Sequence, residues 1–211
     1  MIMVFRQTWA AVRLLIVLVV LTGVIYPLAV WAVSRTPGLE SQAEGSIVTY
    51  DGRPIGSSLI GVNLVGDQYF YGRPSAQASD YSATDTGKLG LAGNDPSSSS
   101  ASNLSQDSAT LAAQIAARKA VIAQREGVNP SQVPPDAVTA SASGVDPDIS
   151  PAYADLQAAR VARANHLSPA LVHQIIAANV RGRALGVLGD PTVNVQAINL
   201  AVARAVQAAE R

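Results

Sequence analysis

One long run of apolar residues dominates the hydrophobic pattern of the chain and lies near its start. From Leu14 to Val33 the sequence is LLIVLVVLTGVIYPLAVWAV, without a charged residue. Twenty residues in a helix span about 30 Å, which is the thickness of the hydrocarbon core of a bilayer. Gly23 and Pro27 would weaken a soluble helix, but both are tolerated in membrane helices. The pattern therefore predicts a transmembrane helix over residues 14–33.

A cleaved signal peptide is the alternative interpretation of this segment. Its apolar run exceeds the ~7–15 residues of a signal-peptide core, and Val30-Trp31-Ala32 is a poor cleavage site. We therefore expect an anchor that is retained. Arg6 and Arg13 precede the span, and this basic bias predicts a cytoplasmic N-terminus over residues 1–13. The rest of the chain would then lie outside the cytoplasm.

The polar and apolar positions after the span predict a short polar linker over residues 34–45 and one domain over residues 46–211, which is long enough to bury a single core. Asp51-Gly52 separates two β-prone runs, and such a pair predicts a hairpin because glycine supplies the positive φ of the tight turn. Pro54 places the return strand at a sheet edge or delays its start. The stretch from Gly72 to Ser105 has little apolar periodicity and predicts an extended surface loop.

Helical periodicity begins at Ser105, which we expect to be an N-cap, and Gly127 marks the end of this first helix. Two Ser-Pro pairs, Ser150-Pro151 and Ser168-Pro169, each predict a helix with a serine N-cap and proline at the first helical position. These two helices are expected to end near His166 and Val180, and Asn194 is expected to cap a last helix. The predicted fold class is α+β: a single N-terminal transmembrane helix, then one soluble domain with a small N-terminal β-sheet and about four helices.

Composition excludes several functions. The chain has 15 basic and 15 acidic residues and no cysteine, so we expect no nucleic-acid partner, no disulfide and no lipid-modified cysteine anchor. Gly87-Lys88 lacks the remainder of a phosphate-binding loop, and no metal-ligand motif occurs. Pro169 separates His166 from His173, and we expect both to be surface or packing residues. No G-x-S-x-G motif is present, which leaves a membrane-anchored serine hydrolase as a disfavoured alternative.

Motifs along the chain, in a specific order, resemble those of the KdpC family of the Kdp potassium-transporting ATPase, over about residues 15–205. They are VLTGVIYPLAV at 20–30, DGRPIGSSLIG at 51–61, YFYGRPSA at 69–76, SNL at 102–104, VTASASGVDPDISPAYADLQAARVA at 138–162 and LGDPTVNV at 188–195. The chain departs from the family at Val62, where glutamine is common, and in the loop Ser100–Gln106. From this resemblance the candidates for family-motif or partner contacts are Arg73, Pro74, Ser75, Asn103, Thr139, Ser141, Ser143, Asp146, Pro147, Ser150 and Asn194.

The resemblance implies a place in a four-part complex of a bacterial inner membrane. The other parts would be a channel-like potassium-binding subunit, a P-type ATPase subunit that hydrolyses ATP, and a very small subunit. The family is described as a catalytic chaperone that raises the ATP affinity of the ATPase subunit. We expect no firmly bound cofactor, no metal and no catalytic residue in this chain, with ATP met only through the ATPase subunit, because the predicted topology puts the domain on the side away from cytoplasmic ATP. An outward-facing cap on the potassium-binding subunit is the favoured role, aiding assembly, stability or ion entry. A free-standing, membrane-anchored module for an extracellular ligand is the alternative.

Two parts of these motifs have a structural and a functional interpretation. The segment Thr139–Pro151 is polar and is stiffened by Pro147 and Pro151; it either presents a surface to a partner or is a helix-entry turn that satisfies its own backbone. Pro74 biases Arg73 to an extended conformation, and the guanidinium offers five donors in a fixed fork. We favour an internal link from Arg73 to an acidic side chain such as Asp146, or to the Ser-rich loop, over a contact with a partner.

Overall fold

The computed structural model describes residues 2–62, 64–76, 91 and 95–210. Much of the predicted surface loop falls on residues 77–90 and 92–94 and therefore lies outside the described residues. The chain forms two compact units, Met1–Ile47 and Val48–Arg211, and each is described by itself.

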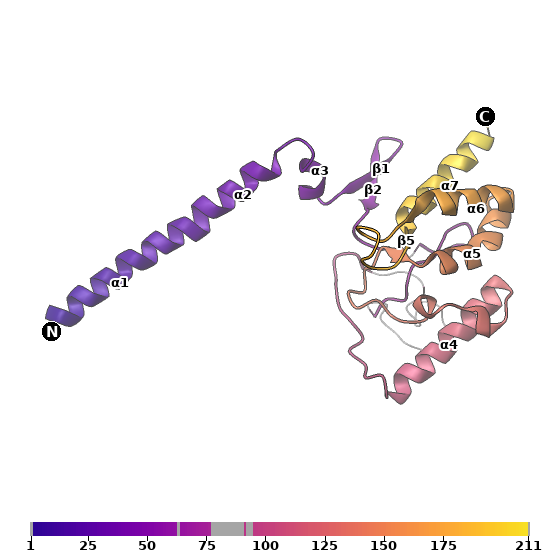
Figure 1. Ribbon diagram of the computed structural model, residues 1–211, viewed down its shortest axis with the longest axis horizontal. Coiled ribbons are helices and arrows are strands. Elements are labelled where there is room, and N and C mark those ends of the chain that lie inside the picture. Colours follow the sequence, from indigo (N-terminus) through magenta and orange to yellow (C-terminus); the bar gives the residue numbers. More distant parts are fainter. Residues whose placement is uncertain (1, 63, 77–90, 92–94, 211) are drawn as a thin grey trace. The chain divides into compact units, whose positions relative to one another are not determined.

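A long helix makes up most of the first unit (Figure 1). It consists of α1 (Ile2–Val20), a π-helical turn (Leu21–Ile25) and α2 (Tyr26–Ser34). Pro27 explains the wide turn: proline has no N–H and its ring crowds the preceding turn, so the backbone widens and the N–H of Tyr26 donates to the carbonyl of Leu21, five residues back. Residues 3–34 are long and apolar enough to cross a membrane. The helix extends well before the predicted start of the span at Leu14.

The predicted linker contains a one-turn helix, α3 (Glu40–Ala43). The guanidinium of Arg35 lies 2.7 Å from a carboxylate oxygen of Glu44 and 3.5 Å from one of Glu40. It also lies 5.7 Å from the centre of the Trp31 ring. These exposed contacts are worth at most about 1 kcal/mol each, but together they describe a linker that turns back on itself rather than an extended one.

The second unit contains two small antiparallel sheets in its described part. The first is a hairpin of β1 (Ile47–Tyr50) and β2 (Arg53–Ser57). Both turn residues have positive φ, 49° at Asp51 and 75° at Gly52, which confirms the predicted tight turn. The second sheet was not predicted: its strand order is β3 (Asp148–Ile149), β5 (Thr192–Asn194), β4 (Val180–Arg181).

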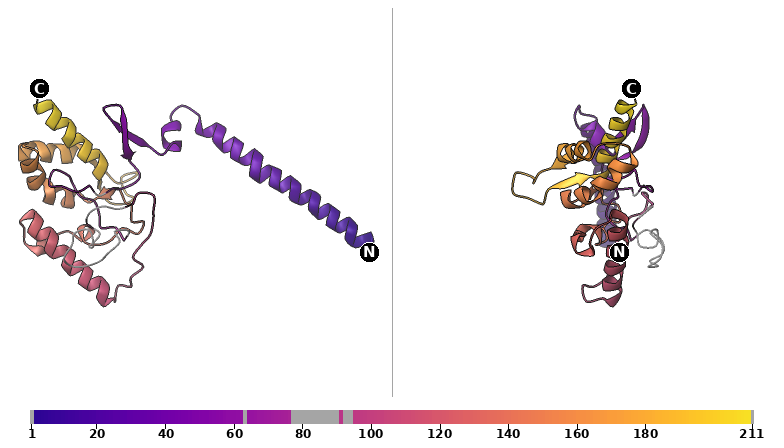
Figure 2. Two further views of the ribbon diagram at one scale, coloured as in Figure 1. Left: turned by 180° about the vertical axis from the view of Figure 1, so that it is seen from behind. Right: turned by 90° about the vertical axis from the view of Figure 1, so that its right-hand side faces the viewer.

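The four predicted helices of the domain are confirmed as α4 (Ala109–Glu126), α5 (Pro151–Ala164), α6 (Pro169–Asn179) and α7 (Val195–Ala209) (Figure 2). The predicted caps of the last three helices are also confirmed, since the side chains of Ser150, Ser168 and Asn194 accept backbone N–H groups of the first turns. The prediction for the first helix was wrong at its start: Ser108, not Ser105, is the N-cap, with its hydroxyl accepting the N–H of Leu111. Gly127 ends α4 with φ 68°, as predicted. Two 3₁₀ turns, η2 (Pro130–Gln132) and η3 (Pro135–Ala137), connect α4 to β3.

Helix α5 lies at the centre of the core, where it contacts α4, α6 and β5. Its buried face combines small residues, which allow close approach, with larger ones that fill the interior. The core around it comes from all four helices and from β3 and β5, with Ile122, Ile149, Val161, Val172, Val193 and Ile198 nearly inaccessible to solvent.

The predicted surface loop from Gly72 onward was wrong in its first part. Gly72, Pro74 and Ser75 are buried, and so is Leu91 further on; Phe70 and Tyr71, just before the predicted loop, are buried as well. The buried backbone at residues 70 and 71 is paired by side chains instead of by a strand. Asn199 accepts the N–H of Phe70 at 2.7 Å and donates to its carbonyl at 3.0 Å. Gln157 likewise accepts the N–H of Tyr71 at 2.8 Å and donates to its carbonyl at 3.1 Å. Two amide side chains therefore make the hydrogen bonds that a neighbouring strand would make, and they hold this segment against α5 and α7.

Candidate functional site

The predicted Thr139–Pro151 segment is bound to three other parts of the domain through its backbone. The N–H of Ser141 donates to the carbonyl of Pro74 at 2.8 Å. The carbonyl of Val145 accepts the N–H of Gly61 at 2.7 Å, and that of Pro147 accepts the N–H of Val195 at 2.8 Å. The segment therefore connects the YFYGRPSA motif, the end of the DGRPIGSSLIG motif and the start of α7. Family motifs that are far apart in the sequence therefore contact this same segment.

Gly61 shows how closely two of these motifs pack. A Cβ atom at this position would lie 2.2 Å from the carbonyl oxygen of Asp146 and 2.7 Å from its carbonyl carbon. Both neighbours are backbone atoms, so they cannot move aside as the end of a flexible side chain would. Only glycine fits here without displacing the segment.

Arg73 forms the predicted internal link to Asp146, and this prediction is confirmed. Its Nη1 donates to Asp146 Oδ2 at 2.9 Å, and both side chains are about one-quarter exposed. Its Nη2 lies 3.4 Å from the carbonyl oxygens of both Thr139 and Ala140. The second carboxylate oxygen of Asp146 accepts the N–H of Asp148 at 3.0 Å. One fork therefore holds both ends of the polar stretch 139–146.

The hydroxyl groups of this segment mostly bind its own backbone. Ser141 Oγ accepts the N–H groups of Ser143 and Gly144, and Ser143 Oγ accepts that of Val145. Thr139 Oγ1 donates to the carbonyl of Pro135. The carbonyl of Ser143 accepts the hydroxyl of Ser99 at 2.9 Å, which ties the Ser-rich run to the segment. These contacts favour the structural interpretation of the segment.

Of the remaining candidate residues, two cap helices and one lies apart from the segment. Ser150 caps α5 and also donates to both carboxylate oxygens of Asp136, from its N–H at 2.7 Å and from its hydroxyl at 2.9 Å. Asn194 caps α7 while its amide donates to Ser58 O at 2.9 Å and Asp148 Oδ1 at 3.2 Å. Asn103 is exposed, with φ 51°, and no described contact joins it to the segment.

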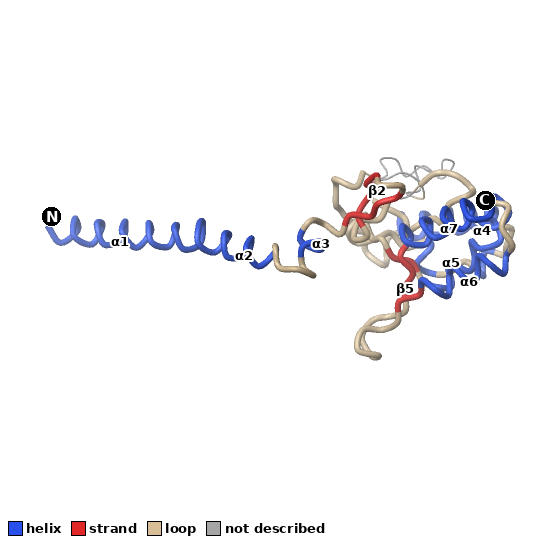
Figure 3. The backbone as a smooth tube through the Cα atoms, turned by 90° about the horizontal axis from the view of Figure 1, so that it is seen from above, coloured by secondary structure: helices blue, strands red, loops and turns tan. Residues whose placement is uncertain are grey.

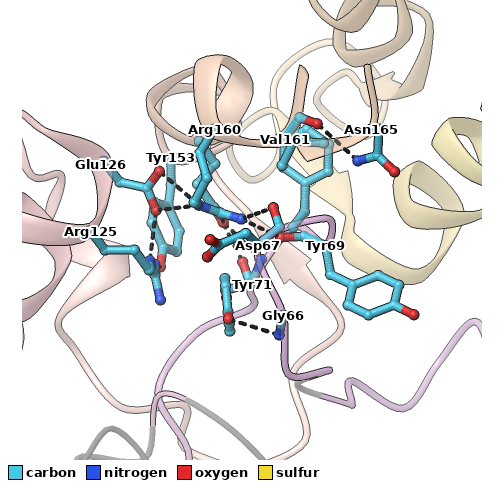
Figure 4. Close-up of polar contacts among 12 residues, drawn as sticks. Gly66, Asp67, Tyr69, Tyr71, Arg125, Glu126, Tyr153, Arg160, Val161 and Asn165 are labelled. Atoms are coloured by element: carbon cyan, nitrogen blue, oxygen red, sulfur yellow. Dashed lines mark hydrogen bonds and ion pairs between the residues drawn. The ribbon is translucent and has the colours of Figure 1, made fainter. Parts of the chain in front are cut away.

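A buried charged cluster, which sequence reasoning did not predict, lies between α4, α5 and residues 67–71 (Figure 4). The Glu126 side chain is 0% exposed and that of Arg160 is 3% exposed, and Arg160 Nε lies 3.1 and 3.0 Å from the two Glu126 oxygens. Arg125 Nε donates to Glu126 Oε1 at 2.7 Å. Arg160 also donates to the carbonyls of Asp67 and Tyr69, at 2.5 and 2.9 Å. The Glu126 carboxylate thus accepts hydrogen bonds from two guanidinium groups. One of them, that of Arg160, also binds the backbone of residues 67–69.

Two tyrosines complete this cluster. The ring of Tyr71 lies 4.0 Å from the guanidinium carbon of Arg125 and 5.0 Å from that of Arg160, which is cation–π geometry. The hydroxyl of Tyr153 accepts a hydrogen bond from Arg125 Nη2 at 3.2 Å. Burial raises the pKa of Tyr153, and the nearby Arg125 charge only partly offsets this effect. The phenol therefore stays protonated well into the alkaline range.

The hydrogen bonds and ion pairs of this segment and of this cluster all join parts of the same domain. Among the residues that the structure describes, no group of three or more His, Asp or Glu side chains could hold a metal ion. His173 lies 3.1 Å from Asp155 on an exposed surface, and His166 is exposed as well, which confirms the prediction for both. What the arrangement does chemically is to fix irregular backbone, since Arg73, Asp146 and Asn194 satisfy backbone groups or a partner charge within the domain.

The fold and the site define a class of protein: an α+β domain with an internally linked polar framework, on a chain whose N-terminal helix is long and apolar enough to anchor it in a membrane. The sequence profile of the KdpC family, described as "K+-transporting ATPase, c chain", matches residues 8–204. The chain belongs to this family.

Relatives named "Potassium-transporting ATPase KdpC subunit" match over nearly the whole chain. The protein from Kineococcus radiotolerans is 44% identical, over 93% of this chain and 93% of its own length. The protein from Bradyrhizobium diazoefficiens is 43% identical, over 95% and 98%, and that from Streptomyces avermitilis is 43% identical, over 93% of each chain.

Proposed function

We propose that this chain is an accessory, non-catalytic subunit of a Kdp-type, ATP-driven potassium importer. The observation that carries the proposal is the family match, which spans the anchor helix and the domain together. The contacts support a non-catalytic role, because Arg73, Asp146 and Asn194 are engaged in linking the domain's own segments. A hydrolase would need side chains that are available to a substrate.

The partners follow from this proposal. They are a channel-like potassium-binding subunit, a P-type ATPase subunit and a small fourth subunit, all in a bacterial inner membrane. Arg6 and Arg13 precede the apolar span, which supports a cytoplasmic N-terminus and an extracytoplasmic domain. In this orientation the domain cannot reach cytoplasmic ATP. Its role is then that of a cap on the potassium-binding subunit, which aids assembly, stability or potassium entry, and ATP is met only through the ATPase subunit.

Two measurements test membership and the lack of catalysis. A tagged chain co-expressed with the other subunits should bring the P-type ATPase subunit out of mild detergent. Release without it would favour the free-standing binding module. The purified chain alone should show no ATP hydrolysis above a blank, and robust turnover without partners would refute the non-catalytic assignment. Labelling of a serine by a serine-directed probe would instead support an anchored hydrolase.

Two further measurements test the anchor and its orientation. Mass spectrometry of the membrane fraction should find peptides that contain Arg6 and Trp9 joined to the chain, whereas a mature N-terminus near Val33 would show that the span is a cleaved signal. Protease added to cells after wall removal should digest the domain and spare residues 1–13. Full protection of the domain would reverse the proposed topology.

A further inference from the structure

An exposed apolar stretch without charge follows the turn of the β1–β2 hairpin. Residues 54–66 read PIGSSLIGVNLVG and contain no Asp, Glu, Lys or Arg. Four aliphatic side chains of this stretch face solvent: Ile55 is 51% exposed, Leu59 60%, Leu64 40% and Val65 71%. Exposed aliphatic residues are ordinary when scattered singly, but four in one charge-free stretch need a reason. We call these four residues the hairpin patch.

A cavity of about 310 Å³ opens beside this patch. It lies between the hairpin, residues 62–69 and α7, and none of the residues that line it is charged; the lining includes Tyr50, Ile55, Val62, Leu64, Tyr69 and Leu200. The amide of Asn199, which also lines it, is engaged with both backbone groups of Phe70. In Figure 4 the ring of Tyr69 points away from the buried charged cluster. The cavity therefore suits an uncharged, apolar group.

The linker keeps the start of the hairpin close to the end of the apolar helix. Arg35 directly follows α2, and its guanidinium lies 2.7 Å from the carboxylate of Glu44. Only three residues separate Glu44 from Ile47, the first residue of β1, and they add at most about 11 Å of chain. Figure 3 follows the chain from α2 through α3 into β2. A bilayer that holds the apolar helix is therefore within reach of the hairpin.

We propose that the hairpin patch lies on the surface of the bilayer that holds the N-terminal helix, and that the cavity takes a lipid acyl chain. The inference rests on the proposed function for the retained anchor. Aliphatic side chains together with tyrosines, which have an apolar ring and a polar tip, are the chemistry of a membrane interface. The charges of the hairpin are one Asp51 and one Arg53, at its tip. Because they balance, neutral phosphatidylcholine should suffice.

A second copy of the chain is the less suitable occupant. A two-fold contact would place the same surface of both copies face to face. A cavity would then meet a cavity, and neither copy would fill the other. The bilayer needs no second chain: the linker holds it beside the hairpin at a high effective concentration whenever the anchor is inserted.

The first test measures lipid contact at a single site in the full chain. The chain has no cysteine, so Leu59→Cys gives one position for an environment-sensitive fluorophore. Leu188→Cys is the matched control, because both leucines are 60% exposed and Leu188 lies outside the patch, between β4 and β5. In phosphatidylcholine vesicles, spin-labelled lipid with its nitroxide near the headgroup should quench the label at position 59 about threefold more than at 188. High salt should leave this ratio unchanged.

The outcomes separate this inference from the proposed function. If the full chain does not float with the vesicles in a density gradient, the proposed anchor fails and this inference fails with it. Flotation with equal quenching at the two positions overturns the inference and leaves the proposed function standing. Quenching that is lost when the vesicles contain the whole complex would assign the patch to a partner subunit and overturn the inference. A disulfide-linked dimer of the Leu59→Cys variant would do so in favour of a second copy.

A second test addresses the cavity. Phosphatidylcholine with a photoactivatable group in its acyl chain should label peptides that line the cavity, as read by mass spectrometry; labelling confined to other peptides would overturn the acyl-chain site. Ala203 lines the cavity, so Ala203→Phe should fill part of it and lower this labelling about fivefold. Ala120→Phe, on an exposed position of α4, is the control and should leave it unchanged. Equal labelling of the two variants would also overturn the site.

Discussion

The buried carboxylate of Glu126 offers the sharpest test of how the domain is held together. Glu126→Gln keeps the shape of the side chain and removes the charge that faces Arg125 and Arg160. Breaking a buried ion pair from one side costs about 3–5 kcal/mol, because the remaining charges stay buried without compensation. Small and mid-sized domains are stable by only about 5–15 kcal/mol. The substitution should therefore remove about a fifth or more of the stability.

This loss of unfolding free energy corresponds to a measurable fall in the melting temperature of the domain. A domain of this size shifts its Tm by about 2–4 °C per kcal/mol, so we expect a fall of roughly 6–20 °C. Trp9 and Trp31, the only tryptophans, both lie in the anchor helix and do not report on the domain. Near-ultraviolet circular dichroism of the tyrosines, measured on the full chain in detergent, is the suitable signal.

A matched control separates burial from charge in this experiment. Asp155→Asn also removes one acid from an ion pair, but Asp155 and His173 are both 54% exposed, so the expected loss is below about 1 kcal/mol. A Tm change of less than about 3 °C for Glu126→Gln, or equal changes for the two variants, would refute the assignment of Glu126 as the charge that holds α4, α5 and residues 67–71 together.

Three further predictions concern the same framework. Arg73→Lys keeps the charge but loses the fork to Asp146 and the carbonyls, and should lower stability by ~1–3 kcal/mol; an unchanged melting transition together with lost assembly would instead make Arg73 a partner contact. Gly61→Ala should cost at least ~1–3 kcal/mol because its Cβ meets backbone, whereas Gly182→Ala, with open space around it, should lie within about 0.5 kcal/mol of the parent; equal melting curves would contradict the close approach. Because the folded state raises the pKa of Tyr153, stability is fully present below the unfolded value near 10 and falls as pH rises above it; Tyr153→Phe should flatten this alkaline decline in urea titrations, and an identical slope would remove Tyr153 as its source.

Local signals made some of this fold predictable from sequence. Asp51-Gly52, the two Ser-Pro pairs and Asn194 each act on backbone within a few residues, and the structure has the expected turn or cap at every one. The three-stranded sheet was missed for the opposite reason. Strands of two or three residues have no measurable alternation. The partner of β3 is far away in sequence, since Asp148 pairs with Asn194, and residues 182–191 between β4 and β5 carry no two-residue hairpin signal.

The buried charged cluster was also missed, although the sequence contained a signal for it. Gln157 and Arg160 are three positions apart, on the same side of α5 as Ala154, Ala158 and Val161, which are buried. Polar residues within an apolar helical stripe indicate a buried network. The identity of their partners, Glu126 and the backbone of residues 67–71, depends on tertiary packing that no local pattern reveals.

In this domain several polar residues of the family motifs bind other parts of the domain, whereas some apolar residues are exposed. This arrangement affects how variants of the two kinds are interpreted. Motif residues such as Arg73 and Asp146 make hydrogen bonds inside the domain, so we expect their substitution to loosen the fold, and a loss of assembly would follow whether or not a partner contacts them. Leu185 and Val187 are exposed and contribute little to the core, so their substitution can change assembly without changing the fold. Loss of assembly is therefore informative about a binding surface only where the domain's melting transition is unchanged, and exposed residues such as Leu185 and Val187 meet that condition better than Arg73 and Asp146 do.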